Sequence, residues 1–507
     1  MYNTISFMKS VIKKLFSENV KQYPEKDAME IESQRFSYHY FNELVETLAT
    51  AIRQQNIKGK AIIVLNEHTV HTYASLLAIH FSDNTILPIE PNWPKQRIEN
   101  ILEQAKPAAL IIAGNAHKNI FTDLCSGITI IDANSGTIIQ RGTVPEDQVT
   151  NYDDIAYILF TSGTTGIPKG VPVKNENLNA FLGYYKSEFD FCHTDRFLQV
   201  YDLTFDVAYF SFLMPMCCGA CCCIVSSKKG VPKYLLIMDD LINRHITVIS
   251  MVPMILHLIK KFLKNWQAPA VRYSSFAGEA LHHSEVLEWQ RFVPNAAIHN
   301  FYGLTETTIV CTGYKWEKEM ASVESSSDIV PIGKPFPGMK IKIVNEQNDH
   351  MPAGEVGELC FTGPQVIDGY LNGLHEEKFF EAADEGSTVR YYKTGDLVSL
   401  NQNGNLIFHG RADLQVKING YRIELEEVEY ALQKVVQEKC IVIKKKTNQN
   451  TDYLKAYIQS KQQDTEMIKR SLLQYLPDYM IPAQFEYIEH IPLSGNGKID
   501  RVYLQSI

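Results

Sequence analysis

The chain has 507 residues, of which 45% are hydrophobic, and its formal net charge is −9. This length is enough for about three or four domain-sized units. The negative charge and the lack of a long basic block exclude a typical nucleic-acid-binding surface. No apolar segment suited to a signal peptide follows the first lysines, and the longest apolar run, 212–225, is too short to cross a bilayer. We therefore expect a cytoplasmic protein with neither a nucleic-acid nor a membrane partner.

Half of the ten cysteines lie in the run 212–225. No histidine lies near them, and adjacent positions on a strand point to opposite faces. We therefore expect small buried side chains in a reducing compartment and no metal site. These cysteines are Cys217, Cys218, Cys221, Cys222 and Cys223.

Helices and strands alternate in the first part of the chain. Apolar residues at helical spacing predict helices at 41–53 and 72–80, and short apolar runs predict buried strands at 61–65 and 86–89. This alternation favours an α/β fold with a doubly wound sheet.

A loop rich in small polar residues follows the apolar run 155–160. Every residue from Thr161 to Gly166 is Gly, Ser or Thr, so hydroxyl and backbone N–H groups are accessible to phosphate oxygens. Pro168 and Gly170 disfavour the helix of a common P-loop, which predicts a return to extended structure at 171–173. We interpret the stretch as a phosphate-binding loop; the alternative is a solvated turn. The predicted ligands are Thr161, Ser162, Gly163, Thr164, Thr165, Gly166 and Lys169.

An aspartate in an apolar setting follows a predicted helix that has its apolar stripe at 178–185. An unpaired Asp206 would be costly there, so either an internal cation or a ligand cation must satisfy it. The residues alone favour an internal partner. Further on, 246–252 and 274–278 are predicted strands.

Two later segments suggest nucleotide chemistry. In the motif 300–308 (Asn-Phe-Tyr-Gly-Leu-Thr-Glu-Thr-Thr), an aromatic face suits a purine and a carboxylate suits Mg²⁺ that bridges phosphates. Short strands broken by Gly and Pro at 330–371 predict an antiparallel β subdomain. Asp396 then lies in Tyr-Lys-Thr-Gly-Asp-Leu, where a carboxylate that bridges a vicinal diol and a hairpin-turn aspartate are about equally plausible.

The last hundred residues have the pattern of a compact α+β unit. A helical stripe at 425–435 precedes strands at 440–443 and 453–458, and a helix through 468–475 ends at Pro477. Near the C-terminus, two glycines precede Lys498. By composition alone this lysine would be an ordinary solvated side chain.

These segments, in this order, resemble the motifs of the adenylate-forming superfamily, which includes acyl-CoA synthetases, luciferases and adenylation domains of nonribosomal peptide synthesis. The resemblance covers roughly 10–507. It implies a large N-terminal core (1–410), a hinge (411–413) and a small mobile C-terminal domain (414–507). Ser82-Asp83-Asn84 replaces the usual Gly-Gly pair, and Asn419 replaces a usual arginine.

The resemblance also implies ATP and Mg²⁺ as cofactors. Tyr302 would stack on adenine, Asn300 would meet its exocyclic amine, and Asp396 would accept both ribose hydroxyls. The implied catalytic residues are Lys498, Thr305, which contacts the α-phosphate, and Glu306, which binds Mg²⁺. The other implied nucleotide-binding residues are Gly278, Glu279, Phe301, Gly303 and Arg411.

The resemblance reverses the interpretation of Asp206. Amino-acid adenylation domains place here the aspartate that holds the substrate ammonium, and the His-x-x-Gly pattern of acyl-CoA ligases is missing. Two phenylalanines narrow the implied pocket, so a small or medium uncharged substrate side chain is expected. The residues implied to line it are Val207, Phe210, Ser250, Ser275, Ala277, Phe301, Ile309 and Val310.

The function implied by the resemblance is ATP-dependent activation of an amino acid. The aminoacyl group would then pass to the phosphopantetheine thiol of a separate carrier protein, because no Leu-Gly-Gly-x-Ser motif occurs in the chain. D-alanine–carrier protein ligases and stand-alone adenylation enzymes both have this organisation. An acyl- or aryl-CoA synthetase and a nucleotide-binding protein without catalysis are the alternatives.

Overall fold

The computed structural model describes residues 11–114, 117–143, 150–163, 167–318, 328–384, 386–447, 451–460, 464–492 and 499–507. The chain forms two compact units. Unit 1 comprises Met1–Pro91, Ala105–Leu159 and Val171–Ala412, and unit 2 comprises Asn92–Gln104, Phe160–Gly170 and Asp413–Ile507. The boundary at Ala412 lies inside the segment 411–413, whose role as a hinge stays a prediction, as do the three predicted domains.

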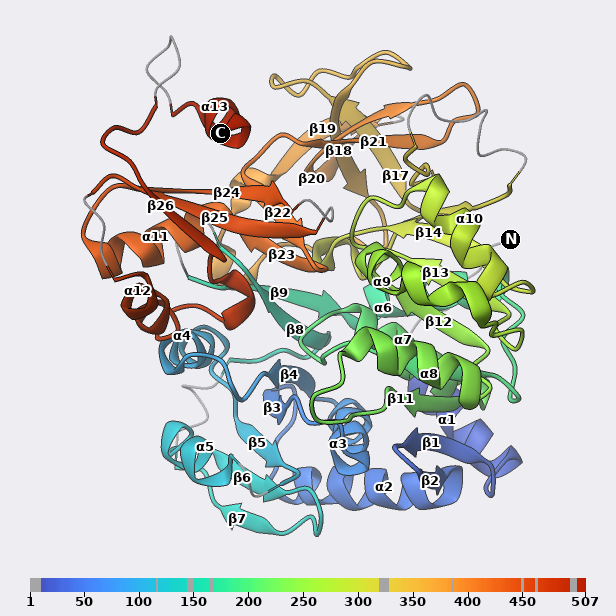
Figure 1. Cartoon of the computed structure of the whole chain (residues 1–507). Helices are drawn as coiled ribbons and strands as arrows, with labels where there is room; N and C mark the ends of the chain where they lie inside the picture. Colours follow the sequence, from blue (N-terminus) through green and yellow to red (C-terminus); the bar gives the residue numbers. More distant parts are fainter. Residues whose placement is uncertain are drawn as a thin grey trace. The chain divides into compact units, whose positions relative to one another are not determined.

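One sheet has seven strands in the order β7-β6-β5-β3-β4-β8-β9 (Figure 1). Its strands are β3 (Ala61–Leu65), β4 (Thr85–Ile89), β5 (Ala109–Ile112), β6 (Thr129–Asp132), β7 (Ile138–Gln140), β8 (Ile155–Thr161) and β9 (Lys169–Lys174). Neighbours from β6 to β8 are parallel. Every residue of β3 and β4 is buried, as expected for strands covered on both faces. The predicted strands and the return to extended structure after the loop are confirmed.

The described residues between 11 and 125 form five helices. They are α1 (Val11–Gln22), α2 (Tyr38–Gln54), α3 (Val70–Phe81), α4 (Lys95–Ala105) and α5 (Lys118–Leu124). Ser37 caps α2 by accepting a hydrogen bond from the Tyr40 N–H, and Thr69 caps α3 in the same way. Both predicted helices of this region are therefore confirmed, and α3 packs on β3 and β4.

A second sheet has nine strands in the order β16-β15-β14-β13-β12-β10-β11-β1-β2. They are β1 (Asp27–Ile31), β2 (Gln34–Ser37), β10 (Arg196–Gln199), β11 (Cys221–Ile224), β12 (Val248–Met251), β13 (Tyr273–Phe276), β14 (Ala297–Tyr302), β15 (Thr312–Lys315) and β16 (Lys334–Pro335). The strands from β1 to β14 are parallel, and the outer strands are antiparallel. The helices of this region are α6 (Asn175–Glu188), α7 (Val207–Cys218), α8 (Lys233–Asn243), α9 (Pro253–Ile259) and α10 (His283–Phe292). Both sheets together confirm the doubly wound α/β class.

The cysteine-rich run is divided between two elements. Cys217 and Cys218 end α7, Gly219 turns the chain with φ 74°, and Cys221 begins β11. The first two cysteines are therefore on a helix and not on a strand, because Gly219 in the left-handed conformation ends the helix there. All are free thiols. Among the described residues, no group of three or more His, Cys, Asp and Glu side chains could hold a metal ion.

The predicted β subdomain is a five-stranded antiparallel sheet. Its strands are β17 (Lys340–Val344), β18 (Gly357–Thr362), β19 (Phe379–Asp384), β20 (Ser387–Leu400) and β21 (Leu406–Arg411). The long β20 pairs with β18, β19 and β21, so it places both Asp396 and the facing Arg411 within one sheet.

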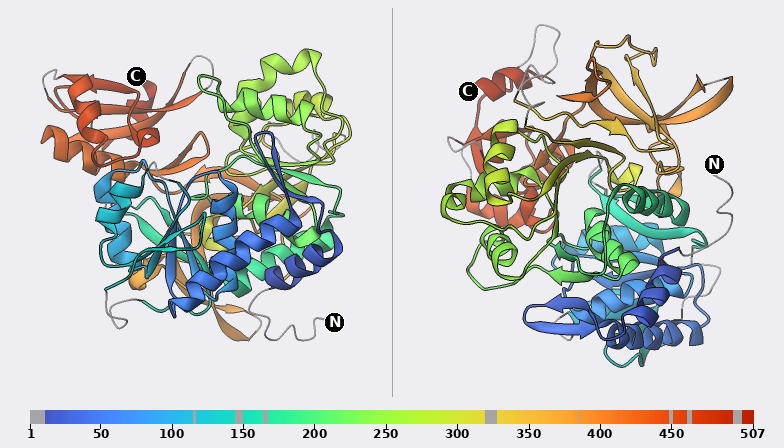
Figure 2. Two further views of the ribbon diagram at one scale, coloured as in Figure 1. Left: turned by 90° about the horizontal axis from the view of Figure 1, so that it is seen from below. Right: turned by 90° about the vertical axis from the view of Figure 1, so that its right-hand side faces the viewer.

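The C-terminal part of unit 2 is α+β, as predicted. It contains β22 (Gln415–Ile418), β23 (Tyr421–Glu424), α11 (Leu425–Val436), β24 (Cys440–Lys446), β25 (Asp452–Ile458), α12 (Thr465–Leu472), β26 (Gln484–Tyr487) and α13 (Arg501–Ser506). Helix α11 packs on β24, in the orange-red part of both views in Figure 2. The predicted helix through Tyr475 is one turn too long. After Leu472 the backbone makes i→i−3 hydrogen bonds from Gln474 and Tyr475, which tighten the chain ahead of Pro477.

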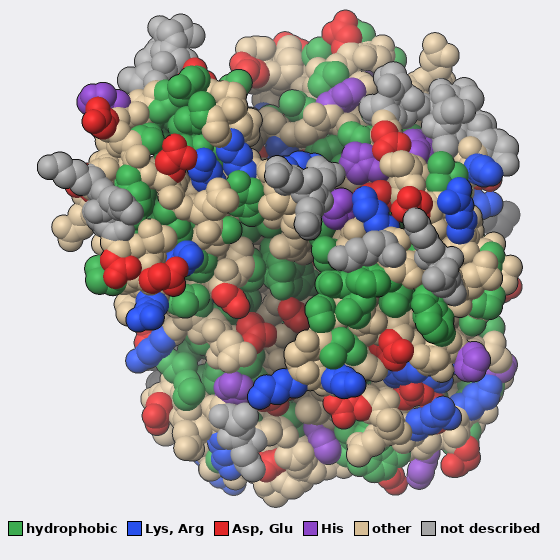
Figure 3. Space-filling view, in the orientation of Figure 1, with side chains coloured by type: hydrophobic (Ala, Val, Ile, Leu, Met, Phe, Trp, Pro, Cys, Tyr) green, Lys and Arg blue, Asp and Glu red, His purple; other side chains and the backbone are tan. Residues whose placement is uncertain are grey.

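Charged side chains of both signs are interspersed with apolar ones over the described part of the face in Figure 3. The sign of the charge therefore changes over short distances on this face. None of the helices in the described ranges is long and apolar enough to cross a membrane.

A buried histidine should make unit 1 sensitive to acid. Burial, the largest cause, lowers the pKa of His80 on α3 from 6.5 to about 4. The neutral ring is thus favoured in the folded state, so its contribution is complete above pH 6.5 and is lost as the pH falls toward 4. We expect the free energy of unfolding to fall by about 3 kcal/mol over this range because of His80. Urea unfolding of His80→Leu at pH 7 and pH 4.5 should show a smaller loss than the wild type. His39→Leu, which removes an exposed histidine, should show the wild-type loss.

Candidate functional site

The predicted site residues fall in both units, and each unit is described by itself. In unit 1, Asn300 lies near the end of β14 and is almost fully buried. Its amide nitrogen donates to the carbonyl oxygens of Val330 (3.2 Å) and Pro331 (2.9 Å). Because both amide hydrogens are used, the side-chain oxygen is left to act as an acceptor. This orientation suits the exocyclic amine of adenine, the role that the motif predicts.

Tyr302, Asp396 and Arg411 form one hydrogen-bonded group. The Tyr302 hydroxyl donates to one carboxylate oxygen of Asp396 at 2.5 Å, and Arg411 donates to the other at 2.8 Å. Asp396 is only 1% exposed. Burial and then the charge of Asp396 raise the pKa of Tyr302 well above its usual value, so the phenol stays a donor. Asp396 is therefore held in place within β20 and is not the hairpin-turn aspartate that was the alternative.

Glu306 lies in a 3-10 turn (Thr305–Thr307) directly after β14 and is fully buried. The Tyr370 hydroxyl donates to its carboxylate at 2.7 Å. A neutral donor leaves the negative charge in place, and a hard carboxylate oxygen fits Mg²⁺, which commonly takes one or two protein carboxylates together with phosphate oxygens. The residues present therefore fit the predicted ion, although Glu306 as its ligand stays a prediction.

The backbone that follows Glu306 is strained and is held by a glutamine. Thr308 and Ile309 have φ of 58° and 71°, a conformation that β-branched residues rarely adopt. A Cβ on Gly303 would lie 2.4 Å from Cα of Val310, so only glycine fits beside this turn. The side-chain nitrogen of Gln365 donates to the Thr307, Thr308 and Val310 carbonyls at 3.3, 3.3 and 2.8 Å. Local sequence patterns gave no signal for this residue, because it is more than 50 positions from the turn.

Removal of this amide should be costly. Gln365 is 2% exposed, so Gln365→Ala would leave buried carbonyls without their donor. We expect the free energy of unfolding to fall by about 3 kcal/mol, measured by urea denaturation. Gln347→Ala, at an exposed position of the same unit, should change it by less than about 0.5 kcal/mol. Equal stability of the two variants would show that Gln365 does not hold the turn.

Asp206 lies at the N-terminus of α7, where the helix dipole favours negative charge. Burial is the main reason that the pKa values of Tyr157, Tyr201 and Tyr209 lie above the usual value. The negative charge of Asp206 raises these pKa values further. All three hydroxyls are buried; those of Tyr157 and Tyr209 have no hydrogen-bond partner among the described residues, and that of Tyr201 interacts with Ser250. Such groups need a polar occupant. Asp206 is half-buried, and a carboxylate beside buried hydroxyls suits an ammonium group.

Most other predicted pocket residues lie on neighbouring elements. Ser250 on β12 pairs in register with Ser275 on β13, and β13 is followed along the sheet by β14, which carries Phe301. The predicted residues that are buried are Phe210, Ser250, Ser275, Ala277, Phe301, Ile309 and Val310; Val207 is half-buried. That these residues line a substrate pocket stays a prediction.

The two phenylalanines among the predicted pocket residues pack against a third aromatic ring. The ring of Tyr185 lies 4.5 Å from that of Phe210 and 5.6 Å from that of Phe301. The sequence predicted Tyr185 as part of a core face, which is confirmed, but gave no sign that it contacts the two phenylalanines.

The predicted ligand Glu279 accepts a hydrogen bond from the Met254 N–H at 3.1 Å, near the start of α9. Gly278 has φ 95°.

In unit 2, the predicted phosphate loop begins at the end of β8. Gly163 is required here, since a Cβ would lie 2.1 Å from the Ile167 carbonyl oxygen. The Thr161 hydroxyl is buried without a hydrogen-bond partner among the described residues. Ser162, Gly163 and Lys169 contact the C-terminal part of the unit. Thr164, Thr165, Gly166 and Lys498 lie outside the described residues.

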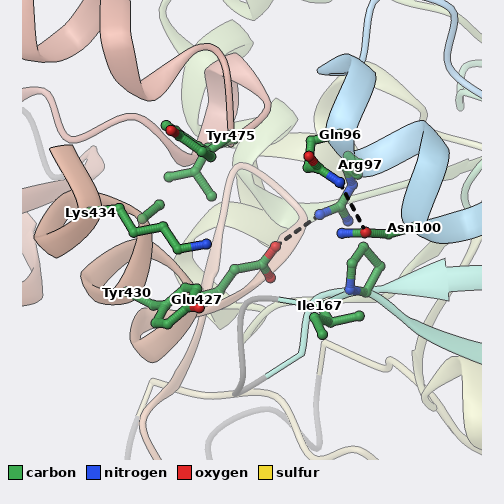
Figure 4. A pocket seen from close by; sticks show the side chains of 11 residues that line it. Gln96, Arg97, Asn100, Ile167, Glu427, Tyr430, Lys434 and Tyr475 are labelled. Carbon is green, nitrogen blue, oxygen red and sulfur yellow. Dashed lines mark hydrogen bonds and ion pairs between the residues drawn. The ribbon is translucent and has the colours of Figure 1, made fainter.

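Unit 2 also contains a cavity of about 330 Å³ (Figure 4). Arg97 and Glu427 form an ion pair of 2.9 Å in its wall, and both are almost fully buried. Lys434 lies 4.4 Å from the ring centre of Tyr430 and 5.8 Å from that of Tyr475. The other lining residues are Gln96, Asn100, Ile167, Pro168, Ala431 and Leu476.

Comparison with known proteins gives the family. A family profile described as AMP-binding enzyme matches residues 16–371. Gramicidin S synthase 2 of Brevibacillus brevis is 33% identical over 98% of this chain, and zwittermicin A synthase ZmaJ of Bacillus cereus is 30% identical over 98% of it. The match covers 95% of ZmaJ but only 11% of gramicidin S synthase 2, and two other synthases are covered over only 9% and 18% of their length.

A solved structure shares the fold over the whole chain. The adenylation domain AlmE of Vibrio cholerae, in complex with glycyl-adenosine-5′-phosphate, aligns over 100% of this chain and 99% of that one. The TM-score is 0.85 at 24% identity. The chain therefore belongs to the family of AMP-binding enzymes, within the adenylate-forming superfamily that its motifs resemble.

Proposed function

We propose that the protein activates an amino acid with ATP and transfers it to a phosphopantetheine thiol of a separate carrier protein. The observation that carries the amino-acid assignment is Asp206. It lies at the start of α7 among three buried tyrosine hydroxyls, in the same unit as Asn300, Tyr302 and Asp396. A carboxylate placed in this way suits an α-ammonium, whereas a fatty or aryl acid has no charge to pair with it.

In the first half-reaction, a carboxylate oxygen of the amino acid attacks the α-phosphorus of ATP. The bond to the β-phosphate oxygen breaks, and pyrophosphate leaves with its electron pair. Asp396 would hold the ribose, Asn300 the adenine amine, and Ser162, Gly163 and Lys169 the phosphates. Bound at Glu306, Mg²⁺ would neutralise phosphate charge. Lys498 would stabilise the charge that develops on phosphorus.

In the second half-reaction, a thiol attacks the carbonyl carbon of the aminoacyl-adenylate. The carbon–sulfur bond forms, AMP leaves, and the thiol proton passes to solvent. The small or medium uncharged substrate is supported by the packing of Phe210 and Phe301 against Tyr185.

Pyrophosphate exchange tests this proposal. We expect ATP–pyrophosphate exchange to depend on a small or medium uncharged amino acid, and not on fatty or aryl acids. Exchange with fatty or aryl acids alone would support an acyl- or aryl-CoA synthetase instead. A clear preference for lysine, glutamate or tryptophan would contradict the predicted pocket size.

A further inference from the structure

Two glutamates of the C-terminal part of unit 2 contact the groups that the proposed function assigns to phosphate. Glu427 accepts a hydrogen bond from the Gly163 N–H at 3.2 Å, and Glu424 lies 3.3 Å from the Lys169 ammonium. Ser162 donates to the Arg422 carbonyl oxygen at 3.1 Å. All the described loop residues with a predicted phosphate contact other than Thr161 are thus engaged by protein oxygens.

Both carboxylates have a further hydrogen-bond partner in unit 2. Arg97 on α4 pairs with the second oxygen of Glu427 at 2.9 Å and lies 5.0 Å from the ring of Trp93, and Figure 4 shows the pair in the cavity wall. Gln415 donates to Glu424 at 2.6 Å. Glu424 and Glu427 are 5% and 2% exposed. Buried carboxylates with several partners have a defined position and are costly to leave unpaired.

The carboxylates and a polyphosphate cannot occupy the loop together. A backbone N–H has one hydrogen, so a Gly163 N–H that donates to Glu427 has none for a phosphate oxygen. Lys169 has three hydrogens and could contact two acceptors, but two carboxylates beside the loop would repel the phosphate charges. A loop that makes these contacts therefore cannot at the same time bind a phosphate oxygen through the Gly163 N–H.

We propose that Glu424 and Glu427 are positioning residues that take over the phosphate-binding groups when pyrophosphate departs. This inference rests on the proposed function. The carboxylates supply the anions that the Gly163 N–H and Lys169 lose with the leaving group. They oppose the return of pyrophosphate, and they hold the C-terminal part in the arrangement used for thiol transfer.

Charge-neutral variants should separate the two half-reactions. Glu427→Gln and Glu424→Gln keep the size of the side chain and lose its charge. We expect the KM for pyrophosphate in ATP–pyrophosphate exchange to fall about tenfold, within the range of typical coupling between binding events. Single-turnover transfer from preformed aminoacyl-adenylate to pantetheine, used as the probe thiol, should become slower. A lower KM for pyrophosphate is a gain that misfolding cannot produce.

Two further variants complete the test. Glu426→Gln changes a half-buried glutamate of the same helix that has no hydrogen bond to the described residues of the loop, and it should behave like the wild type. Arg97→Gln keeps the Glu427 charge and removes only its guanidinium partner, so it should not lower the KM for pyrophosphate as Glu427→Gln does. An unchanged KM for pyrophosphate in the glutamate variants, or an equal loss in both half-reactions, would overturn the inference. Absence of amino-acid-dependent exchange in the wild type would instead overturn the proposed function.

Discussion

Asp206→Ala is expected to lower kcat/KM for the amino acid about a hundredfold or more, with little change in the KM for ATP. An ammonium about 4 Å from a carboxylate gains up to about 4 kcal/mol at an effective dielectric constant of 20, before desolvation is subtracted. The nucleotide does not share this contact, because its proposed ligands Asn300, Tyr302 and Asp396 belong to other elements. Pyrophosphate exchange, with each substrate varied in turn, gives both constants.

The matched control is Asp202→Ala, four residues earlier. Asp202 has a cation of the protein within reach, Lys233 at 3.7 Å, so it should not be needed for the substrate. Its variant should keep the wild-type KM for the amino acid. If Asp206→Ala weakens the use of ATP and of the amino acid equally, Asp206 is structural and the acyl- or aryl-CoA synthetase alternative gains support.

Much of the fold could be predicted because its signals are local. The strand at 61–65 was predicted with the bounds that the structure shows, because a continuous apolar run of five residues is typical of a buried strand and too short for most helices. The cysteine-rich run shows the limit. Its composition is apolar throughout, so periodicity could not show that Gly219 ends a helix and that a strand begins at Cys221. The backbone conformation of Gly219 alone separates the helix from the strand.

The residues of the candidate site also differ in how well the sequence predicts them. The types of residue expected to bind a nucleotide are visible in short motifs, but the groups that hold them in place come from distant positions. Gln365 supports the turn after Glu306, and Arg97 reaches Glu427 across 330 positions of sequence. A single sequence gives no signal for such pairs, because neither partner forms a recognisable motif with its sequence neighbours. For the same reason, the sequence did not predict that three tyrosines lie near Asp206.

The ribose contact gives the second large effect. Asp396 carries one donor on each carboxylate oxygen, from Tyr302 and from Arg411, and each oxygen can accept another hydrogen bond. Two vicinal hydroxyls of a ribose fit these positions. Hydrogen bonds to a charged group contribute about 1.5–3 kcal/mol each. Loss of the charge in Asp396→Asn should therefore raise the KM for ATP about a hundredfold.

Substrate analogues and a milder variant show whether Asp396 itself makes this contact. The wild type should use 2′-deoxy-ATP much less well than ATP, and Asp396→Asn should discriminate between them far less. Tyr302→Phe keeps the ring and removes only the hydroxyl that supports Asp396, so its KM for ATP should rise about tenfold or less. Urea midpoints of both variants exclude unfolding as the cause. If Asp396→Asn retains the full wild-type discrimination against 2′-deoxy-ATP, the carboxylate does not bind the 2′-hydroxyl. Asp396 would then be a structural partner that holds Tyr302 and Arg411 together.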